Sequence, residues 1–257
     1  MRVLVTGGRG FLGVHVCEAL RAAGHDVTAL GRTDGDLAEP DVAERLVEER
    51  SPDAVVHLAA VMPGDERLAQ NAPLTELVAR ACAARGIPLF HGSTTSVYGD
   101  ETPYAASKRA SEEVAGDATI LRFHFPYGPG QRRGAIPGML EQALAGERVV
   151  VHRGRERSFC FVGDAAAAVA ILVSRGEGGD WDVGRDDDRR PLEEVARLVC
   201  AVSGAAESLI EAVDPPEGAA PAGGPLDTER LRSLGWRPEV DLEEGVDRTL
   251  AWLRAQA

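Results

Sequence analysis

Lysine is almost absent from this 257-residue chain: Lys108 is the only one, and arginine supplies every other strongly basic side chain. Positive charge as a whole is in short supply, because 28 basic residues face 41 acidic ones and give a net charge of −13 at pH 7. A strongly acidic protein repels nucleic acid. We therefore expect no nucleic-acid partner, and we interpret the scattered acid as a solvated surface.

Cysteine and long apolar runs are also scarce. The four cysteines lie far apart with no Cys-x-x-Cys spacing, which indicates buried thiols rather than disulfides or a metal site, and the six histidines are dispersed. No apolar run approaches the roughly 18 residues of a transmembrane helix. Met1-Arg2 lead directly into a short strand, without the pattern of a signal peptide. We expect a cytoplasmic protein with no metal and no membrane contact.

Short apolar runs alternate with longer amphipathic segments over the first half of the chain. Strands are predicted at 2–6, 26–30, 54–59, 88–91 and 118–123, and helices at 11–23, 40–50, 73–85 and around Tyr104. This alternation predicts an α/β fold with a doubly wound parallel sheet of the Rossmann type. The continuous apolar character of the strands indicates that helices cover both faces of the sheet.

The pattern changes after Arg122, where Pro126 to Gly130 form a turn-rich crossing. Further helices are predicted at 136–145, 164–174, 192–202, 228–234 and 242–254, with a strand at 149–152 and a loop rich in Pro, Gly and Ala at 215–225. We expect residues 1–122 to form a dinucleotide-binding domain, to which about 159–184 return. Residues 123–257 are expected to form mainly a smaller, substrate-binding lobe.

A glycine pattern, Gly7-x-x-Gly10-x-x-Gly13, lies between the first strand and the first helix. Gly7 permits a tight turn, Gly10 lets a phosphate approach the backbone, and Gly13 lets the helix and strand pack closely. The positive end of the helix dipole favours an anion at the same place. The pattern predicts a dinucleotide pyrophosphate site, and a plain turn between strand and helix is the alternative.

The residues after the second strand indicate which dinucleotide binds. A site for NAD usually has a carboxylate there, which binds the ribose hydroxyls. This chain has Gly31-Arg32-Thr33 instead, so no acid at Gly31 repels a 2′-phosphate, and Arg32 can pair with it. NADP is therefore favoured over NAD, with Asp36 and Leu37 expected at the adenine. The alternative is that Arg32 is an ordinary surface residue.

The chemical centre is predicted at Tyr104 and Lys108, which stand four residues apart on one face of a helix. A nearby ammonium lowers the pKa of a tyrosine and suits it to proton transfer with an alcohol or carbonyl oxygen, which the hydroxyls of Ser93 and Thr94 could hold from the other side. A Tyr–Lys pair is also common on solvated helices. Arginine would serve on such a surface, however, so the position of the only lysine favours the functional interpretation.

Together these residues resemble the extended short-chain dehydrogenase/reductase family of NAD(P)-dependent sugar epimerases, dehydratases and ketoreductases. The resemblance covers nearly the whole chain in order. It rests on Thr6 to Gly13, His57-Leu58-Ala59-Ala60, Asn71, Ser93 to Gly99, Tyr104-x-x-x-Lys108, Tyr127-Gly128-Pro129-Gly130, Arg157-Ser158-Phe159, Leu234 to Pro238, Glu243-Glu244-Gly245 and Trp252.

The resemblance implies a role for each matched position. Tyr104 would be the acid/base, Lys108 would bind the nicotinamide ribose and tune Tyr104, and Thr94 would be the catalytic hydroxyl. Further cofactor contacts would come from Phe11, Leu12, Leu58, Ala59 and Ala60, and substrate contacts from Ser93, Thr95, Tyr127 and Arg157. Arg157 would bind a diphosphate, unless it is simply a surface arginine. Relatives commonly form homodimers through the helices around Val78 and Tyr104.

Two departures from the family pattern limit the activity. Thr95 and Ser96 stand where the family's 4,6-dehydratases place an Asp-Glu pair, which argues against a dehydratase. Phe125 stands where many sugar-nucleotide enzymes carry an asparagine that touches the substrate phosphates, and the segment between Thr94 and Tyr104 is short.

Our leading hypothesis is an NADPH-dependent ketoreductase that acts on a nucleotide-linked deoxysugar, at C4. The alternatives are an NAD-dependent nucleotide-sugar 4-epimerase, a reductase of a small non-sugar ketone or aldehyde, and a non-catalytic dinucleotide-binding protein.

Overall fold

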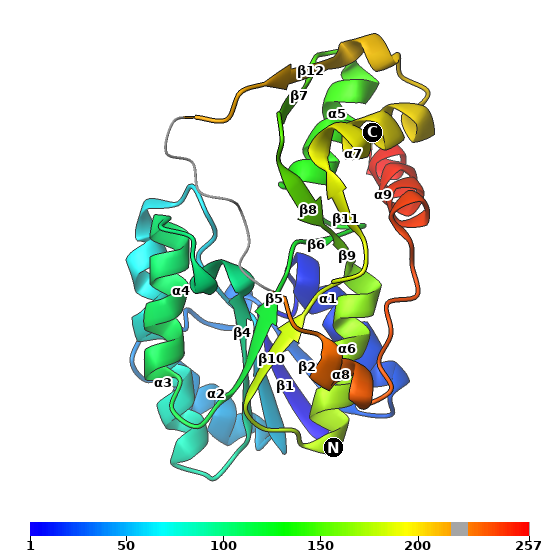
Figure 1. Ribbon diagram of the computed structural model, residues 1–257. Helices are drawn as coiled ribbons and strands as arrows, with labels where there is room; N and C mark the ends of the chain where they lie inside the picture. Colours follow the sequence, from blue (N-terminus) through cyan, green and yellow to red (C-terminus); the bar gives the residue numbers. More distant parts are fainter. Residues whose placement is uncertain (217–225, 257) are drawn as a thin grey trace.

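A six-stranded parallel sheet forms the centre of the protein, whose computed structural model describes residues 1–216 and 226–256 (Figure 1). The strand order is β10-β5-β4-β3-β1-β2, and every neighbouring pair is parallel. The strands are β1 (Arg2–Thr6), β2 (Asp26–Leu30), β3 (Ala54–His57), β4 (Leu89–Thr94), β5 (Thr119–Phe123) and β10 (Asp180–Val183). The predicted doubly wound Rossmann-type sheet is confirmed.

Helices cover both faces of this sheet, as the apolar strands predicted. On one side lie α1 (Phe11–Ala22) and α6 (Val162–Arg175), and on the other α2 (Val42–Arg50), α3 (Asn71–Ala83) and α4 (Pro103–Val114) (Figure 1). Side chains alternate along β1, so that Val3 and Val5 join the core with Val169 of α6. Leu4 joins the opposite core with Val78 of α3. Both faces are therefore dry, which explains why no polar residue interrupts the middle of β1.

The edge strand β10 has no counterpart among the predicted strands. It pairs with β5 in the register Asp180 to Ile120 and Val183 to Phe123. Its sequence, Asp-Trp-Asp-Val, alternates charged and apolar residues over only four positions, which is too short for a clear strand signal. An edge position tolerates these charges because one side of the strand faces no neighbour.

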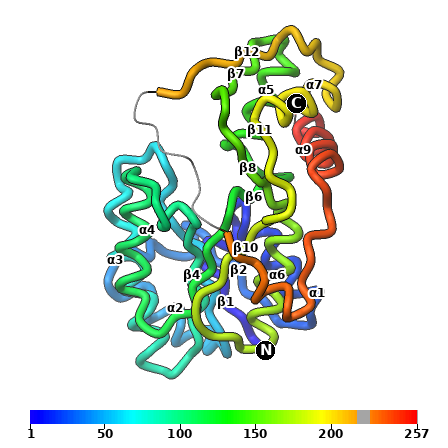
Figure 2. The backbone as a smooth tube through the Cα atoms, viewed as in Figure 1, coloured from blue at the N-terminus to red at the C-terminus, as the bar shows by residue number. Residues whose placement is uncertain are grey.

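The remaining elements form a lobe beyond the carboxyl ends of the sheet strands (Figure 2). Its core includes Ile136, Leu140, Val149, Val195 and Val246. Its helices are α5 (Ala135–Ala145), α7 (Leu192–Ser203) and α9 (Leu242–Gln256). Its strands form three pairs: β7 (Val149–His152) with β12 (Ile210–Val213), β8 (Glu156–Ser158) with β11 (Arg189–Pro191), and β6 (Pro126–Tyr127) with β9 (Cys160–Phe161).

Short elements complete the chain. They are α8 (Glu229–Ser233) and the 3₁₀ turns η1 (Arg32–Asp34), η2 (Glu66–Gln70), η3 (Thr95–Tyr98) and η4 (Glu207–Leu209). The helix predicted from Pro40 begins instead at Val42, with Asp41 as its N-cap. The predicted loop at 215–225 falls almost wholly outside the described residues. Within 1–216 and 226–256, no helix combines the length and apolarity needed to cross a membrane.

Candidate active site

The glycine turn joins β1 to α1 at the carboxyl edge of the sheet. A Cβ at Gly13 would lie 2.1 Å from the Gly7 oxygen, so only glycine allows this approach of helix and turn. A Cβ at Gly7, whose φ is +67°, would lie 2.6 Å from the Ala59 nitrogen. Arg9 and Gly10 are exposed at the start of α1. The turn therefore offers accessible backbone at a positive helix end, a cradle that fits a pyrophosphate.

The residues after β2 are arranged differently from the prediction. An acid does stand near this strand end, because the Asp34 carboxylate accepts a 2.8 Å hydrogen bond from the Gly31 nitrogen. It also pairs with Arg9 at 3.0 Å. The Gly31 hydrogen bond, assisted by Arg9, holds the pKa of Asp34 below its usual value. Arg32 is exposed as the first residue of η1.

Arg9 is a candidate cofactor residue that the sequence analysis missed. Its side chain reaches from the glycine turn across Gly31, where a Cβ would lie 3.0 Å from the Arg9 Cδ, and it hydrogen bonds to the Thr33 hydroxyl. Its position inside the glycine pattern is the signal that could have found it, since that turn lies beside the end of β2. The Arg9 side chain therefore lies against Gly31, and the exposed Arg32 follows Gly31 in the chain.

Asp36 and Leu37, predicted to contact the adenine, lie beyond η1. The Asp36 carboxylate accepts a 3.0 Å hydrogen bond from the Ala38 nitrogen and is exposed, whereas Leu37 packs partly against the core beneath α2. Their adenine contacts stay predictions.

Tyr104 and Lys108 lie on α4, whose N-cap Thr102 accepts a 3.2 Å hydrogen bond from the Ala105 nitrogen. Lys108 is 2% exposed, and its Nζ donates to the Gly92 oxygen at 2.7 Å. Burial lowers the pKa of Lys108 to about 8, and the charge of Glu112 opposes that shift.

The predicted effect of Lys108 on Tyr104 is wrong in this structure. Burial raises the pKa of Tyr104 to about 12 instead of lowering it. The physical reason is that the phenolate would lose its hydration in this half-buried position, while the Lys108 ammonium is directed to the Gly92 carbonyl. Tyr104 is therefore a protonated phenol at neutral pH.

The hydroxyls at the end of β4 have three different environments. Ser93 is 5% exposed and donates to Glu112 Oε1 at 2.5 Å. Thr95 is 2% exposed, and its hydroxyl lies 2.7 Å from His124 Nδ1. Thr94 stays partly exposed, and its Oγ1 accepts a 3.2 Å hydrogen bond from the Ser96 nitrogen. Of the three, Thr94 is the one placed to contact a substrate without rearrangement.

Two buried histidines occupy β3 and β4 near Lys108. The rings of His57 and His91 stack with centroids 5.4 Å apart. His57 Nδ1 lies 2.6 Å from the Thr6 hydroxyl, whereas both ring nitrogens of His91 are buried without a hydrogen-bond partner. Burial, and then the charge of Lys108, lower the pKa of His57 to about 3 and that of His91 well below its usual value. Both rings are therefore neutral.

Past β3, Leu58, Ala59 and Ala60 are partly exposed beside the glycine turn.

The predicted substrate residues lie where the chain passes into the lobe. Arg157 stacks its guanidinium over the ring of Phe125, 4.6 Å from the centroid, and burial lowers the pKa of Arg157. Phe125 itself has a φ of +39°, in the left-handed region. Tyr127 is 2% exposed, and its hydroxyl donates to the Leu242 oxygen at 3.4 Å inside the lobe core. A contact between Tyr127 and a substrate would require that side chain to move.

A glycine cradle that fits a dinucleotide and a Tyr–Lys pair on α4 are typical of a dinucleotide-dependent oxidoreductase. Residues 3–184 match the family model described as "NAD dependent epimerase/dehydratase family". The chain belongs to this family, and the resemblance to extended short-chain dehydrogenases/reductases is confirmed. The protein is an enzyme of the NAD(P)-dependent oxidoreductase type.

The relatives are distant in sequence, and the similarity covers nearly the whole of this chain. The chain is 26% identical to dTDP-D-glucose 4,6-dehydratase of Mus musculus over 317 aligned positions, covering 98% of this chain and 88% of that protein. Since 317 exceeds the 257 residues of this chain, the mouse protein carries segments that this chain lacks.

Solved structures show the same relation. The UDP-glucose 4-epimerase of Thermus thermophilus, in complex with NAD, is 26% identical, with a TM-score of 0.87 and 100% of both chains covered. DesIV, a dTDP-glucose 4,6-dehydratase of Streptomyces venezuelae with NAD and TYD bound, is 25% identical, with a TM-score of 0.85, and 99% of this chain and 97% of DesIV are covered.

Proposed function

We propose that this protein is a ketoreductase that uses NADPH to reduce a keto group, at C4, of a nucleotide-linked deoxysugar. The observation that carries the proposal is the protonated phenol of Tyr104 on α4, four residues before the buried Lys108. A reduction requires a proton donor for the nascent alkoxide, and a phenol with a raised pKa holds its proton until that stronger base appears.

Each residue then has one part in the reaction. The glycine turn would hold a dinucleotide by its pyrophosphate, and that cofactor would supply the hydride for the carbonyl carbon. Tyr104 donates its proton to the carbonyl oxygen, and Thr94 holds that oxygen by a hydrogen bond. Lys108 stays mainly protonated at pH 7, because its pKa is about 8, and, as the family resemblance implies, it would bind the nicotinamide ribose.

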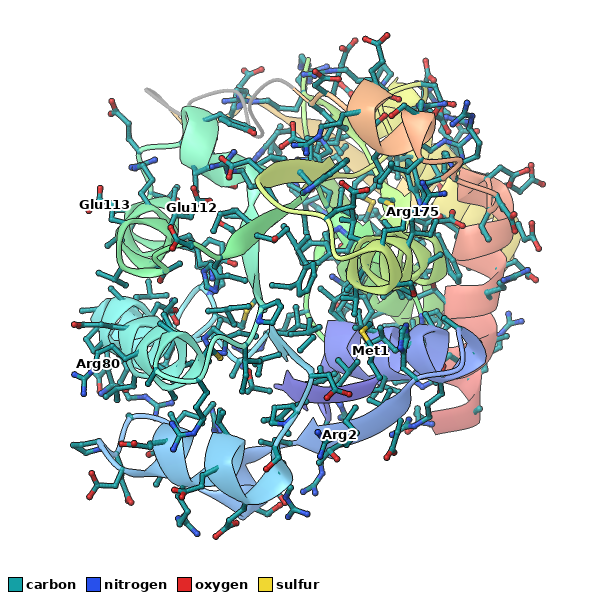
Figure 3. All side chains as sticks on the ribbon, turned by 90° about the horizontal axis from the view of Figure 1, so that it is seen from below. Met1, Arg2, Arg80, Glu112, Glu113 and Arg175 are labelled. Atoms are coloured by element: carbon teal, nitrogen blue, oxygen red, sulfur yellow. The ribbon has the colours of Figure 1, made fainter. Side chains whose placement is uncertain are left out.

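The choice of NADPH is supported by the two arginines around Gly31. A 2′-phosphate suits paired guanidinium groups, and the Asp34 carboxylate is already engaged by Arg9 and the Gly31 nitrogen. Thermal-shift titrations with NADPH and NADH test this choice. We expect R9Q and R32Q each to weaken the binding of NADPH at least about fivefold and to leave the binding of NADH unchanged. R80Q, on the exposed side of α3 (Figure 3), is the matched control. A preference for NADH in the parent protein would contradict the proposal.

The substrate class is supported by the relatives and by Arg157. Curated relatives include a dTDP-D-glucose 4,6-dehydratase and a UDP-glucuronic acid decarboxylase, enzymes named for nucleotide sugars. The test is the loss of NADPH absorbance with a nucleotide-linked 4-keto-6-deoxysugar, compared with simple ketones and aldehydes as substrates. Turnover of the simple carbonyl compounds alone would contradict the nucleotide-sugar proposal and would identify a small ketone or aldehyde as the substrate.

A 4-epimerase is the second candidate, supported by the similarity to the Thermus enzyme. An epimerase returns its hydride to the sugar, so it consumes no nucleotide. Conversion of UDP-glucose to its C4 epimer without NADPH loss would establish this alternative and contradict net reduction.

We also propose that the protein forms a homodimer through the outer surfaces of α3 and α4. The two helices lie next to each other on one face of the sheet, which leaves their outer sides available (Figure 1). Sedimentation equilibrium tests the proposal, and a monomer at micromolar concentration would contradict it.

A further inference from the structure

A third residue shares the helix face of Tyr104 and Lys108. Glu112 follows Lys108 by four positions, so the three side chains project one above another along α4. The Glu112 side chain is only 14% exposed and lies on the sheet side of the helix, whereas Glu113 lies on the outer side (Figure 3). A carboxylate with so little exposure needs partners within the protein.

Glu112 has two such partners, both on sheet strands. Arg122 of β5 donates from Nε at 3.0 Å and from a terminal guanidinium nitrogen at 2.7 Å, a two-pronged ion pair. Ser93 of β4 donates at 2.5 Å to Oε1, the oxygen that also accepts from Arg122 Nε. Arg122 also contacts Asp180 at 2.7 Å and the Tyr98 hydroxyl at 3.0 Å. The carboxylate is therefore fixed from two strands at once.

The contacts of Glu112 with Arg122 and Ser93 form a clamp, and this clamp lies next in sequence to Gly92, the residue that binds Lys108. Ser93 follows Gly92, whose carbonyl oxygen accepts the 2.7 Å hydrogen bond from Lys108 Nζ. A side chain cannot replace hydrogen at Gly92 without conflict, since a Cβ there would lie 2.8 Å from Leu58 Cδ2. The backbone oxygen that binds the ammonium therefore precedes, in the same strand, the residue whose side chain binds Glu112.

The other groups facing Lys108 do not supply negative charge. The rings of His57 on β3 and His91 on β4 are neutral, and α3 presents the uncharged Asn71 and Thr75. Tyr104 is protonated, and Tyr98 of η3 is bonded to Arg122 and Asp182. Glu112 is the charge that opposes the effect of burial on Lys108, and it is paired with Arg122.

We propose that Glu112 is a positioning residue for the active-site lysine: its carboxylate, clamped by Arg122 and Ser93, keeps the Lys108 ammonium charged and directed at Gly92. Lys108 acts on the reaction, and Glu112 acts through Lys108. The inference rests on the proposed function for the catalytic part of Lys108, but not for the electrostatic coupling itself.

The sole lysine makes this coupling directly measurable. Protein labelled with ¹³C at lysine Cε gives one side-chain signal, from Lys108, whose chemical shift against pH yields its pKa by NMR without any substrate. We expect E112Q to lower the Lys108 pKa by about one unit, because a neighbouring negative charge is lost. The exposed E113Q is the matched control and should change that pKa by less than about 0.2 units.

The sign of the change separates coupling from general damage. A lower Lys108 pKa in E112Q cannot come from loss of structure, because exposure of this buried lysine raises its pKa toward the ordinary 10.5. An unchanged or higher Lys108 pKa in E112Q would overturn the proposal. R122M removes the cation that pairs with Glu112, so it should raise the Lys108 pKa at temperatures where its circular dichroism matches that of the parent. If E112Q does not fold, R122M measured under those conditions decides alone: a rise supports the coupling, and an unchanged or lower pKa refutes it. Failure of the ketoreductase proposal would appear only in the substrate assays.

Discussion

The two ends of the active site are built in different ways. The pyrophosphate cradle at the cofactor end consists of backbone and small residues within one continuous stretch, where Gly7 and Gly13 allow β1 and α1 to approach closely. The proposed substrate end consists of large side chains from separate segments, such as Phe125 beneath Arg157. The first is a property of local sequence, and the second is a property of tertiary packing.

The two ends also recognise different kinds of ligand. A pyrophosphate is the same group in every member, so a fixed backbone cradle serves it. A substrate is recognised by side chains, and a single replacement there, such as Phe125, changes both the polarity and the partner of its neighbour Arg157. The following variants test the comparison at each end and at the Tyr–Lys pair between them.

Removing the Tyr104 hydroxyl should have the largest effect. We expect Y104F to lower kcat about 10²- to 10⁴-fold, because the reaction loses its proton donor, while NADPH affinity changes little. Steady-state kinetics and a binding titration measure the two effects. Y98F is the control, since the Tyr98 hydroxyl bonds to Asp182 at the sheet edge, and it should keep kcat within about threefold. Equal rates in Y104F and the parent would remove Tyr104 from the mechanism.

At the cofactor end, a single methyl group should be enough to damage the cradle. G13A places a Cβ against the Gly7 oxygen, so we expect a loss of at least about 2 kcal/mol of stability and of most dinucleotide binding. G138A is the matched control on α5, where a Cβ would meet no atom within 4 Å. It should raise stability by about 0.5–1 kcal/mol. Denaturant titrations and calorimetry measure both, and normal binding by G13A would contradict the cradle.

Between the two ends, we expect Lys108 to lower the free energy of unfolding of the protein. Its folded pKa of about 8 lies below the ordinary 10.5, so the unfolded chain binds more protons between these values. The contribution of Lys108 to stability should therefore rise as pH increases from about 8 to 10.5. K108M should be about 1–3 kcal/mol more stable at pH 7, with the difference shrinking over that window. Urea unfolding at several pH values measures it, and a K108M protein less stable than the parent would refute it.

At the substrate end, the expected effect is smaller. If Arg157 binds a diphosphate, R157M should weaken the binding of UDP or dTDP about tenfold, because a charge-assisted hydrogen bond is lost. R153M is the control: Arg153 is 62% exposed and pairs with Asp214. It should change affinity less than about twofold. Isothermal titration calorimetry compares them, and equal affinities would favour a substrate without a diphosphate.

The sequence predicted the features that depend on neighbours along the chain. The bounds of β1 follow from its apolar run, and Tyr104 and Lys108 share a helix as their spacing required. The features it missed depend on distant partners. The strand β10 is recognisable only beside β5, and Glu112 becomes significant only when Arg122 and Ser93 approach it.

The direction of the Tyr104 pKa was wrong for the same reason. A spacing of four residues says that an ammonium is near, but not how deeply the phenol is buried or where the ammonium points. Asp34 at the cofactor end is a second example of what the sequence could not predict. Its carboxylate binds the Gly31 nitrogen because η1 forms a turn between them, and no periodic pattern predicts that turn.

The late return of β10 to the sheet has a consequence for synthesis of the protein. As the chain leaves the ribosome, β5 is complete before α5, β7 and β8 of the lobe appear, and only afterwards can β10 pair with it. Until then β5 is a bare edge, open to the strands of other nascent chains. Arg122 and Ser93 on this half-built sheet give it charged and polar groups during the interval, and the last strand then closes the edge.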